Sequence, residues 1–409
     1  MVRAEAEVVQ AGDRLVAVLP DRRRVYDQER AQFAAQRLGE TPGLVALRRA
    51  RQALEVANPV SYYPRFKPHR NLWLPPFEET YVQVTLEDGT TGLGLTHHGR
   101  VTAALIDDYF APRLLGEDGL AVERLNDLMR RLSVPYGETG LASYAVSAID
   151  LALWDARGRA YGKPVYELLG GGGREPLALY ATGNDLDWYL ELGFRAFKLA
   201  CPYGPADGLD GLRKNEAFVA KARETIGPDC DLMLDCWMAF DVEYAVQLAE
   251  RLRPYKLTWM EECLIPEDYD AHVALRERLP WQTLSTGEHW TTTFPFQWAA
   301  SHHVVDILQP DIAWCGGLTA CWKIAGIGQA AGMRIILHGG ANNVFGHHFS
   351  YASQAAHLAE FFVGTQPGVP LEEAGHLPGM ALPKNGTLLP NDAPGFGLEV
   401  PADWLVPFA

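Results

Sequence analysis

The sequence predicts an α/β fold, a (β/α)8-type barrel with a smaller α+β domain in front of it. The main observation is a pattern that occurs five times between residues 231 and 339, in which a short, mostly apolar run ends in an ionisable residue. The steps between these ends are 26, 27, 23 and 27 residues, and amphipathic segments such as 242–253 fill much of the space between them. The five runs are DLMLD, LTWMEE, TLSTGE, VDILQPD and RIILH.

Short apolar runs that alternate with helices are typical of parallel strands buried on both faces. A unit of roughly 25 to 30 residues suits a barrel whose active groups all lie at the carboxyl ends of its strands. A single acid at a strand end is as typical of a helix N-cap or half of an ion pair as of an active site. Five such ends in successive units favour the active site.

Three carboxylates, from Asp235, Glu261 and Glu288, are expected to meet on one side of the barrel mouth. They cannot all stay ionised at close range without a cation. Because this set offers only oxygen ligands, it favours a hard ion, Mg²⁺ above Mn²⁺ or Ca²⁺.

Asp311 and His338 end the next two strands. Asp311 could hydrogen-bond one nitrogen of His338, fix its tautomer and raise its basicity. A metal opposite a base suits carbanion chemistry, in which the metal holds a substrate carboxylate and the charge of an enediolate while the base removes the neighbouring α-proton.

Composition limits the partners. The 409 residues are enough for a barrel plus one smaller domain, and 48 % hydrophobic residues predict a large packed core. A net charge of −15 argues against nucleic acid and acidic membrane surfaces, although a bound dication would still admit an anionic substrate. The sequence has no apolar stretch of 18 residues, no signal peptide pattern and no CxxC pair among its six cysteines. We therefore expect a cytoplasmic protein with reduced cysteines.

Residues 1–165 are expected to form the α+β capping domain. Residues 79–98 alternate around Asp88-Gly89, which predicts a β-hairpin, and helical segments are expected at 103–114, 122–132 and within 139–171. The Pro-rich segment 58–76 is either a packed cover or a substrate-facing lid. Its candidates for binding an anion are Arg65, Lys67, His69 and Arg70.

The barrel is expected over residues 166–367, followed by an irregular tail, 368–409, that returns to the capping domain. LALYAT at 177–182 predicts the first strand, FRAFKLA at 194–200 the second, and 360–363 the last. Lys198 on the second strand should then lie near the mouth. The histidine pairs share no metal-ligand spacing, and most of them are interpreted as structural: His97-His98, His302-His303 and His347-His348.

The acidic ladder, the QPD motif and the His 27 residues beyond it resemble the enolase superfamily, mandelate racemase subgroup. Within it, WMEECLIPEDY, STGEHW, QPDIAWCGGLT and DCW look like the motifs of L-rhamnonate dehydratases and their acid-sugar relatives. The resemblance covers residues 58 to 400 and implies Mg²⁺ on the three carboxylates with His338 and Asp311 as the base.

Four further residues take roles only through this resemblance. It implies that Lys198 is a cation near the substrate carboxylate and that Glu360, 22 residues beyond His338, hydrogen-bonds that carboxylate. His289, which follows the third ligand, is implied to reach substrate hydroxyls. Arg70 resembles an Arg of the family's specificity loop.

One position departs from mandelate racemase, whose second strand carries a Lys-x-Lys pair with the second Lys as a base on the opposite face. Here that position is Ala200. A base on one face disfavours racemisation, whereas syn elimination needs only His338, and the dehydratase relatives share this pattern.

The resemblance thus implies an Mg²⁺-dependent dehydratase that converts an aldonate, first of all L-rhamnonate, to a 2-keto-3-deoxy acid. Other acid sugars, such as L-lyxonate and L-mannonate, stay open because the HGGANN run and the absence of an upstream specificity His depart from the pattern. An epimerase and a non-catalytic sugar-acid binder are the weaker alternatives. Relatives of this kind assemble as dimers or octamers, which implies a homo-oligomer.

Overall fold

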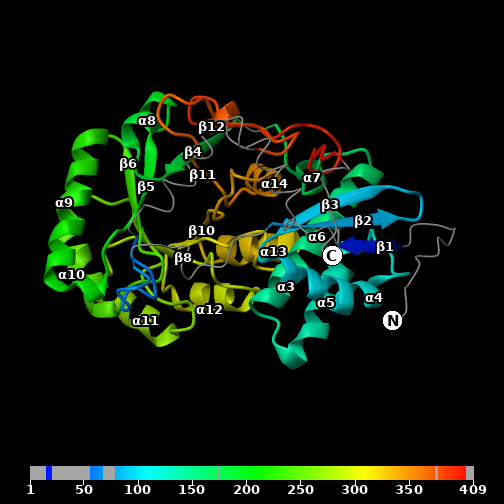
Figure 1. The fold of residues 1–409 in the computed structure, drawn as a ribbon, viewed down its shortest axis with the longest axis horizontal. Coiled ribbons are helices and arrows are strands. Elements are labelled where there is room, and N and C mark those ends of the chain that lie inside the picture. The colour runs from blue at the N-terminus through cyan, green and yellow to red at the C-terminus, as the bar shows by residue number, and fades with distance from the viewer. Residues whose placement is uncertain (1–14, 21–55, 68–78, 174, 374–375, 402–409) are drawn as a thin grey trace.

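The structure is a computed structural model that describes residues 15–20, 56–67, 79–173, 175–373 and 376–401. Figure 1 shows a barrel of strands surrounded by helices, with a smaller sheet-and-helix domain beside it. The predicted fold class, a (β/α)8-type barrel with an α+β capping domain, is confirmed. The boundaries at 165 and 367 stay predictions.

Eight parallel strands follow one another around the barrel in the described residues, in the order β10-β9-β8-β7-β6-β5-β4-β11. Between β10 and β11 the gap is bridged by a hydrogen bond from Ala341 N to Glu360 O (2.7 Å). The strands are β4 (Leu177–Thr182), β5 (Ala196–Ala200), β6 (Asp231–Asp235), β7 (Trp259–Glu261), β8 (Leu284–Thr286), β9 (Ile307–Leu308), β10 (Arg334–Ile335) and β11 (Leu358–Phe362).

A helix lies between each strand and the next, as the spacing predicts. The amphipathic segment expected at 242–253 is α10, whose N-cap Asp241 accepts a hydrogen bond from Tyr244 N (2.8 Å). The helices are α8 (Leu186–Glu191), α9 (Gly208–Ile226), α10 (Val242–Leu252), α11 (Tyr269–Arg278), α12 (Phe294–His302), α13 (Gly317–Ala330) and α14 (Val344–Ala352).

Alternation along β6 explains how an apolar strand presents an acid. Met233 belongs to a small buried cluster inside the barrel together with Trp259, while Leu232 and Leu234 belong to the larger core between sheet and helices. Because side chains alternate with a period of two, Asp235 faces the same side as Met233, one layer nearer the carboxyl end. The polar groups of the mouth therefore lie on an apolar floor.

The capping domain contains the predicted hairpin, β2 (Thr80–Leu86) and β3 (Thr91–Thr96), to which β1 (Leu15–Pro20) adds a third antiparallel strand. The segment expected to be helical from 103 to 114 comprises α3 (Gly99–Ala104), a π-helical turn at Leu105–Phe110 and α4 (Ala111–Leu114). Two further predicted helices are α5 (Val122–Ser133) and α6 (Leu141–Ala160), after which the chain forms the short α7 (Val165–Leu168).

Helix α6 is buried between the capping sheet and the barrel. A Cβ on Gly94 of β3 would lie 2.0 Å from Ala148 O, so only glycine lets the strand approach the helix this closely. On its other side, Ser147 Oγ accepts from Gly316 N (2.8 Å) and Asp150 Oδ2 accepts from Thr319 N (3.0 Å) at the start of α13. These bonds fix the capping domain against the carboxyl ends of the strands.

The C-terminal segment (orange to red in Figure 1) runs from the barrel back over the capping domain. A short strand, β12 (Thr387–Leu388), pairs antiparallel with β4. Further on, Phe396 N donates to Asp155 Oδ1 (2.7 Å) and Val165 N donates to Gly395 O (2.9 Å).

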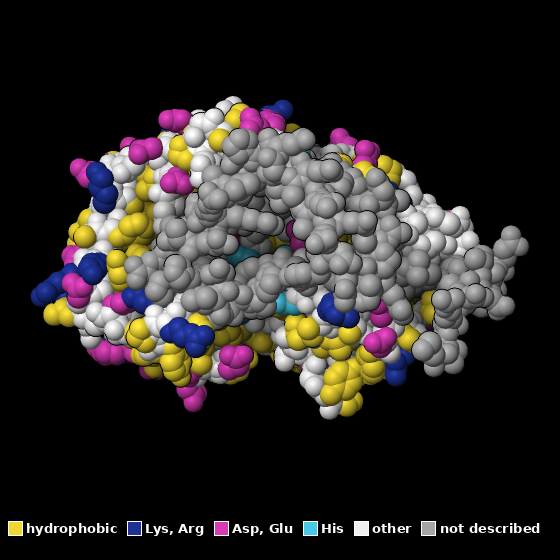
Figure 2. All heavy atoms as spheres, viewed as in Figure 1, with side chains coloured by type: hydrophobic (Ala, Val, Ile, Leu, Met, Phe, Trp, Pro, Cys, Tyr) yellow, Lys and Arg dark blue, Asp and Glu magenta, His cyan; other side chains and the backbone are white. Residues whose placement is uncertain are grey.

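On the left of Figure 2, Lys and Arg side chains lie among Asp and Glu side chains on the surface. Of the histidine pairs, His347 and His348 are buried on α14, and burial lowers their pKa values to about 4 and about 3, so both are neutral core residues.

No helix in the described residues has the length and apolar content to cross a bilayer.

Candidate active site

The three predicted metal ligands meet at the barrel mouth. Asp235 and Glu261 are the last residues of β6 and β7 and are paired in register, and Glu288 follows β8 by two residues. One oxygen of each carboxylate lies within 4.8 Å of the others, which is the span of a single ion's coordination shell. This convergence follows from parallel strands that end at the same rim.

The chemistry of these carboxylates fits a dication. Burial, together with Glu288, raises the pKa of Asp235 to about 7 although Lys198 lowers it, and burial likewise raises the pKa of Glu261 to about 7 against Lys198. Buried acids with raised pKa values lack positive charge around them. Glu288 differs, because burial raises its pKa but His338 and then His289 lower it below its usual value. The all-oxygen donor set of these three carboxylates suits Mg²⁺, and the residues present therefore fit that ion.

Lys198 lies among the acids on the interior face of β5. Its ammonium group pairs with Glu261, with Glu360 Oε1 (2.8 Å) and, more distantly, with Asp235 Oδ2 (3.8 Å). Burial lowers its pKa, but Glu261 and Glu360 outweigh that effect and raise it well above the usual value, so the ammonium is charged. A single Lys does not balance the acids around it.

Glu360 is on β11, as predicted, and closes the ring of charged groups. It accepts hydrogen bonds from Thr182 Oγ1 (2.5 Å) and Gly339 N (2.9 Å). Burial raises its pKa, but Lys198 and then His338 lower it to about 2. The group is therefore a carboxylate in this structure, whereas the expected hydrogen bond to a substrate carboxylate requires its protonated form.

His338 and Asp311 form a dyad. The Nδ1 of His338 lies 2.7 Å from Asp311 Oδ2, and its Nε2 lies 3.6 Å from Glu288 Oε2. Asp311 is itself held by Ala313 N, which donates to Oδ1 (2.7 Å). With Nδ1–H donated to Asp311, the lone pair of a neutral ring is on Nε2, which faces the carboxylates. The His338 side chain is 28 % exposed, so a substrate can reach it.

The basicity of His338 is raised by the groups around it. Burial lowers the pKa of His338, but Glu288, the hydrogen bond to Asp311 and Glu360 raise it well above its usual value. The imidazole thus binds a proton firmly while several negative groups surround it.

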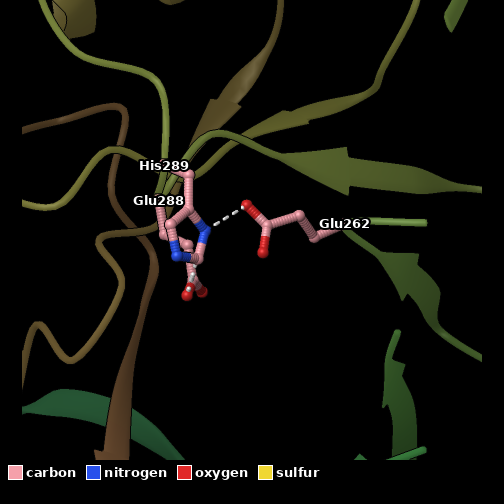
Figure 3. Close-up of side chains that lie close together, drawn as sticks. All are labelled: Glu262, Glu288 and His289. Carbon is pink, nitrogen blue, oxygen red and sulfur yellow. Dashed lines mark hydrogen bonds and ion pairs between the residues drawn. The ribbon is translucent and has the colours of Figure 1, made fainter. Parts of the chain in front are cut away.

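His289 and Glu262 form a second pair that extends the acidic site. Figure 3 shows the His289 ring facing the Glu262 carboxylate, with Nδ1 2.8 Å from Oε1 and 3.5 Å from Glu288 Oε1. Burial lowers the pKa of His289, but Glu262 and Glu288 raise it to about 9. Glu262 has no role in the sequence prediction, and the doubled acid in LTWMEE was the signal that could have found it. Its φ of 45° turns the chain, so that two consecutive acids both reach the site.

Glu261 is held in place by two buried donors that the sequence analysis missed. Trp259 Nε1 and Gln309 Nε2 both donate to Glu261 Oε2 at 2.8 Å. Trp259 lies two residues before Glu261 on the same strand face, and Gln309 is in the QPD motif, so both could have been inferred from alternation and from the motif.

Ala200 lies beside Asp235 in the paired register of β5 and β6 and on the same face of β5 as Lys198. No basic side chain occupies this position. Eight of the nine predicted site residues are joined by the contacts above, and their roles stay predictions. Arg70 lies outside the described residues, as does His69, while Lys67 pairs with Asp207.

Comparison with known proteins agrees with this geometry. Residues 184–404 match the family described as enolase C-terminal domain-like, and residues 75–170 match the mandelate racemase / muconate lactonizing enzyme N-terminal domain. The chain belongs to the enolase superfamily. Within this superfamily it is 38 % identical over 350 residues to the L-rhamnonate dehydratase of Saccharopolyspora erythraea, which covers 84 % of this chain and 89 % of that protein.

Two solved structures that resemble this chain have the same fold. The rhamnonate dehydratase from Gibberella zeae complexed with Mg superposes with a TM-score of 0.82 at 32 % identity, over 87 % of this chain and 89 % of the other. The 3,6-anhydro-D-galactonate cycloisomerase from Zobellia galactanivorans gives 0.70 at 30 % identity, over 80 % and 93 %.

Proposed function

We propose that the protein is an Mg²⁺-dependent acid-sugar dehydratase that converts L-rhamnonate to its 2-keto-3-deoxy acid. The observation that carries the proposal is the His338 and Asp311 dyad opposite a three-carboxylate site, with Ala200 at the position where mandelate racemase carries its second base. Such a site can remove a proton from one face only.

Asp235, Glu261 and Glu288 would hold the Mg²⁺. When bound there, Mg²⁺ supplies positive charge that stabilises the negative charge a carboxylate group gains as its α-carbon loses a proton. The ammonium group of Lys198 lies among the same acids and would add a second positive charge that attracts the substrate carboxylate.

His338 would perform both proton transfers. Its Nε2 takes the C2 proton while Nδ1–H stays bonded to Asp311, whose charge stabilises the imidazolium. The same Nε2–H then gives that proton to the C3 hydroxyl, which leaves as water. The remaining enol becomes the 2-keto-3-deoxy acid, and the ring is neutral again, so the proton count balances.

Two further residues would contact the substrate away from the reacting carbons. His289, held by Glu262 at the rim, would contact substrate hydroxyls, and Arg70 remains a candidate from the sequence alone. The substrate itself is suggested by relatives, because the proteins from Saccharopolyspora erythraea and Gibberella zeae are both named for rhamnonate.

The experiment is a screen of the purified protein with Mg²⁺ against a panel of aldonates and aldarates, with 2-keto-3-deoxy products detected by semicarbazide. We expect one strong response, to L-rhamnonate. A response to another sugar acid alone, such as L-lyxonate or L-mannonate, would overturn the substrate and keep the reaction. No product from any member would contradict the dehydratase.

Two finer expectations belong to this proposal. A homo-oligomer is expected and would be tested by light scattering of the purified protein. A cytoplasmic location is expected from the sequence and would be tested by fractionation of the native cells.

A further inference from the structure

Trp314 lies at the centre of an aromatic cluster that the proposed reaction does not use. It is the third residue after Asp311, in the turn that follows β9, where Trp314 N donates to Asp311 O (3.1 Å). Its side chain is buried, at 6 % exposure. The residue that orients the base and the residue that packs on it therefore share one turn.

The indole contacts both imidazoles of the site. Its ring centroid lies 5.1 Å from that of His338, with 41° between the planes, and 5.7 Å from that of His289. The hydrogen bond to Asp311 fixes only the Nδ1 end of the His338 ring. The ring can still rotate about the line of this hydrogen bond. A packed indole limits this rotation and so fixes where Nε2 points.

The capping domain holds the other side of the indole. Tyr144 of α6 stacks on Trp314 (5.5 Å, 20°), and His98 stacks in turn on Tyr144 (5.1 Å, 23°). The indole Nε1–H donates to His97 Nδ1 (3.0 Å). His98 has a φ of 73°, a conformation that few residues other than glycine adopt, which places its ring at the end of the stack.

We propose that the His98, Tyr144 and Trp314 stack positions His338, so that the base is aligned by contacts from the capping domain. These three are positioning residues, because they act through Trp314 on the imidazole. The inference rests on the proposed function in taking His338 as the base. It assigns the capping domain a part in proton transfer in addition to covering the mouth.

Tyr144 is the residue to change, because it links the two domains and is only half-buried. Tyr144→Leu removes the stacked ring, whereas Tyr144→Phe keeps the ring and removes the hydroxyl. The matched control is Tyr109→Leu, which removes a half-buried tyrosine of the same domain that packs on Phe110 and Tyr136 and donates to Leu132 O (2.8 Å).

We expect Tyr144→Leu to lower kcat by about 10- to 100-fold, the loss that follows from a misplaced catalytic group, with KM within about twofold of wild type. Tyr144→Phe should recover most of kcat, and Tyr109→Leu should keep the wild-type kcat. Equal losses in the two Leu variants would overturn the proposal in favour of general destabilisation. A raised KM in Tyr144→Phe would overturn it in favour of a direct hydroxyl contact with the substrate.

A second readout does not depend on activity. This readout is the NMR spectrum of protein labelled with ¹⁵N-histidine, recorded at fixed pH. The imidazole signals of His338 are assigned from their loss in His338→Asn. They should shift in Tyr144→Leu and not in Tyr109→Leu. Unchanged His338 signals in Tyr144→Leu would contradict the stack. If wild type shows no dehydratase activity, the proposed function fails, and this spectrum still decides whether the stack holds the ring.

Discussion

The two sides of the barrel mouth differ in how their charges are balanced. On the carboxylate side, Asp235, Glu261 and Glu288 crowd together, and burial raises the pKa of the first two to about 7. On the imidazole side, an acid, Asp311, and a base, His338, form a hydrogen bond of 2.7 Å. The carboxylate side therefore needs a bound cation to balance its negative charges, whereas the groups of the imidazole side balance each other within the protein.

Glu288 belongs to both sides, since it joins the metal set and lies 3.6 Å from His338 Nε2. Glu288→Gln keeps the shape and removes the charge, so we expect kcat/KM to fall by at least about 10³-fold at saturating Mg²⁺, the upper end for loss of one charge-stabilising group. Steady-state kinetics measure this. Glu243→Gln, an exposed change on α10, should behave as wild type. Activity above a tenth of wild type in Glu288→Gln would mean that the two sides do not share this residue.

The stability difference between wild type and Asp235→Asn should depend on whether Mg²⁺ is bound. Because the folded pKa of Asp235 is raised from 3.8 to about 7, ionising it costs folding free energy, a cost that is absent below pH 3.8, grows up to pH 7 and is complete above it. At pH 8 in EDTA, Asp235→Asn should therefore unfold at a higher temperature than wild type. With excess Mg²⁺ this difference in unfolding temperature should shrink, because only wild type gains the full binding term, about 2.7 kcal/mol at 100 times Kd.

Thermal unfolding of both proteins in the two buffers measures how much the difference shrinks. A difference of the same size in EDTA and in Mg²⁺ would show that the bound ion does not offset the cost of ionising Asp235. Wild type at pH 5, where the cost is only partly present, serves as the internal control.

A smaller effect should separate the ligands from the residues that hold them. Gln309→Met removes the donor to Glu261 Oε2, so we expect Mg²⁺ affinity to fall by about 10- to 100-fold, as is common for partners of metal ligands. Calorimetric titration with Mg²⁺ measures the affinity. Gln247→Met, the same change on the exposed face of α10, should leave it unaltered. An unchanged affinity in Gln309→Met would show that the Gln309 hydrogen bond does not position Glu261 for the metal.

The sequence predicted the site where it depends on local periodicity. Asp235, Glu261, Glu288, Asp311 and His338 follow short apolar runs at near-constant spacing, and parallel strands bring such ends to one rim. Lys198 followed from the direction of its strand. These features need only the period of the strand and of the βα unit.

The rest depends on contacts between distant segments or on backbone turns. Tyr144 and Trp314 are 170 residues apart in sequence and meet only because α6 packs against the barrel mouth. Glu262 faces the site because of a positive φ that alternation does not predict. The strand β1 pairs with a hairpin more than 60 residues downstream, and no pattern in residues 1–57 indicated it.

The most direct test of the division between metal and base is the fate of the C2 proton in His338→Asn. Wild type and variant are incubated with L-rhamnonate and Mg²⁺ in D₂O, and the C2–H signal is followed by proton NMR. The control is His303→Asn, because His303 is exposed and asparagine tolerates its φ of 49°. We predict that wild type and His303→Asn lose this signal as product forms, while His338→Asn keeps it although calorimetry still shows Mg²⁺ binding. Loss of the C2 proton in His338→Asn at a rate near that of wild type would contradict the assignment of His338 as the base.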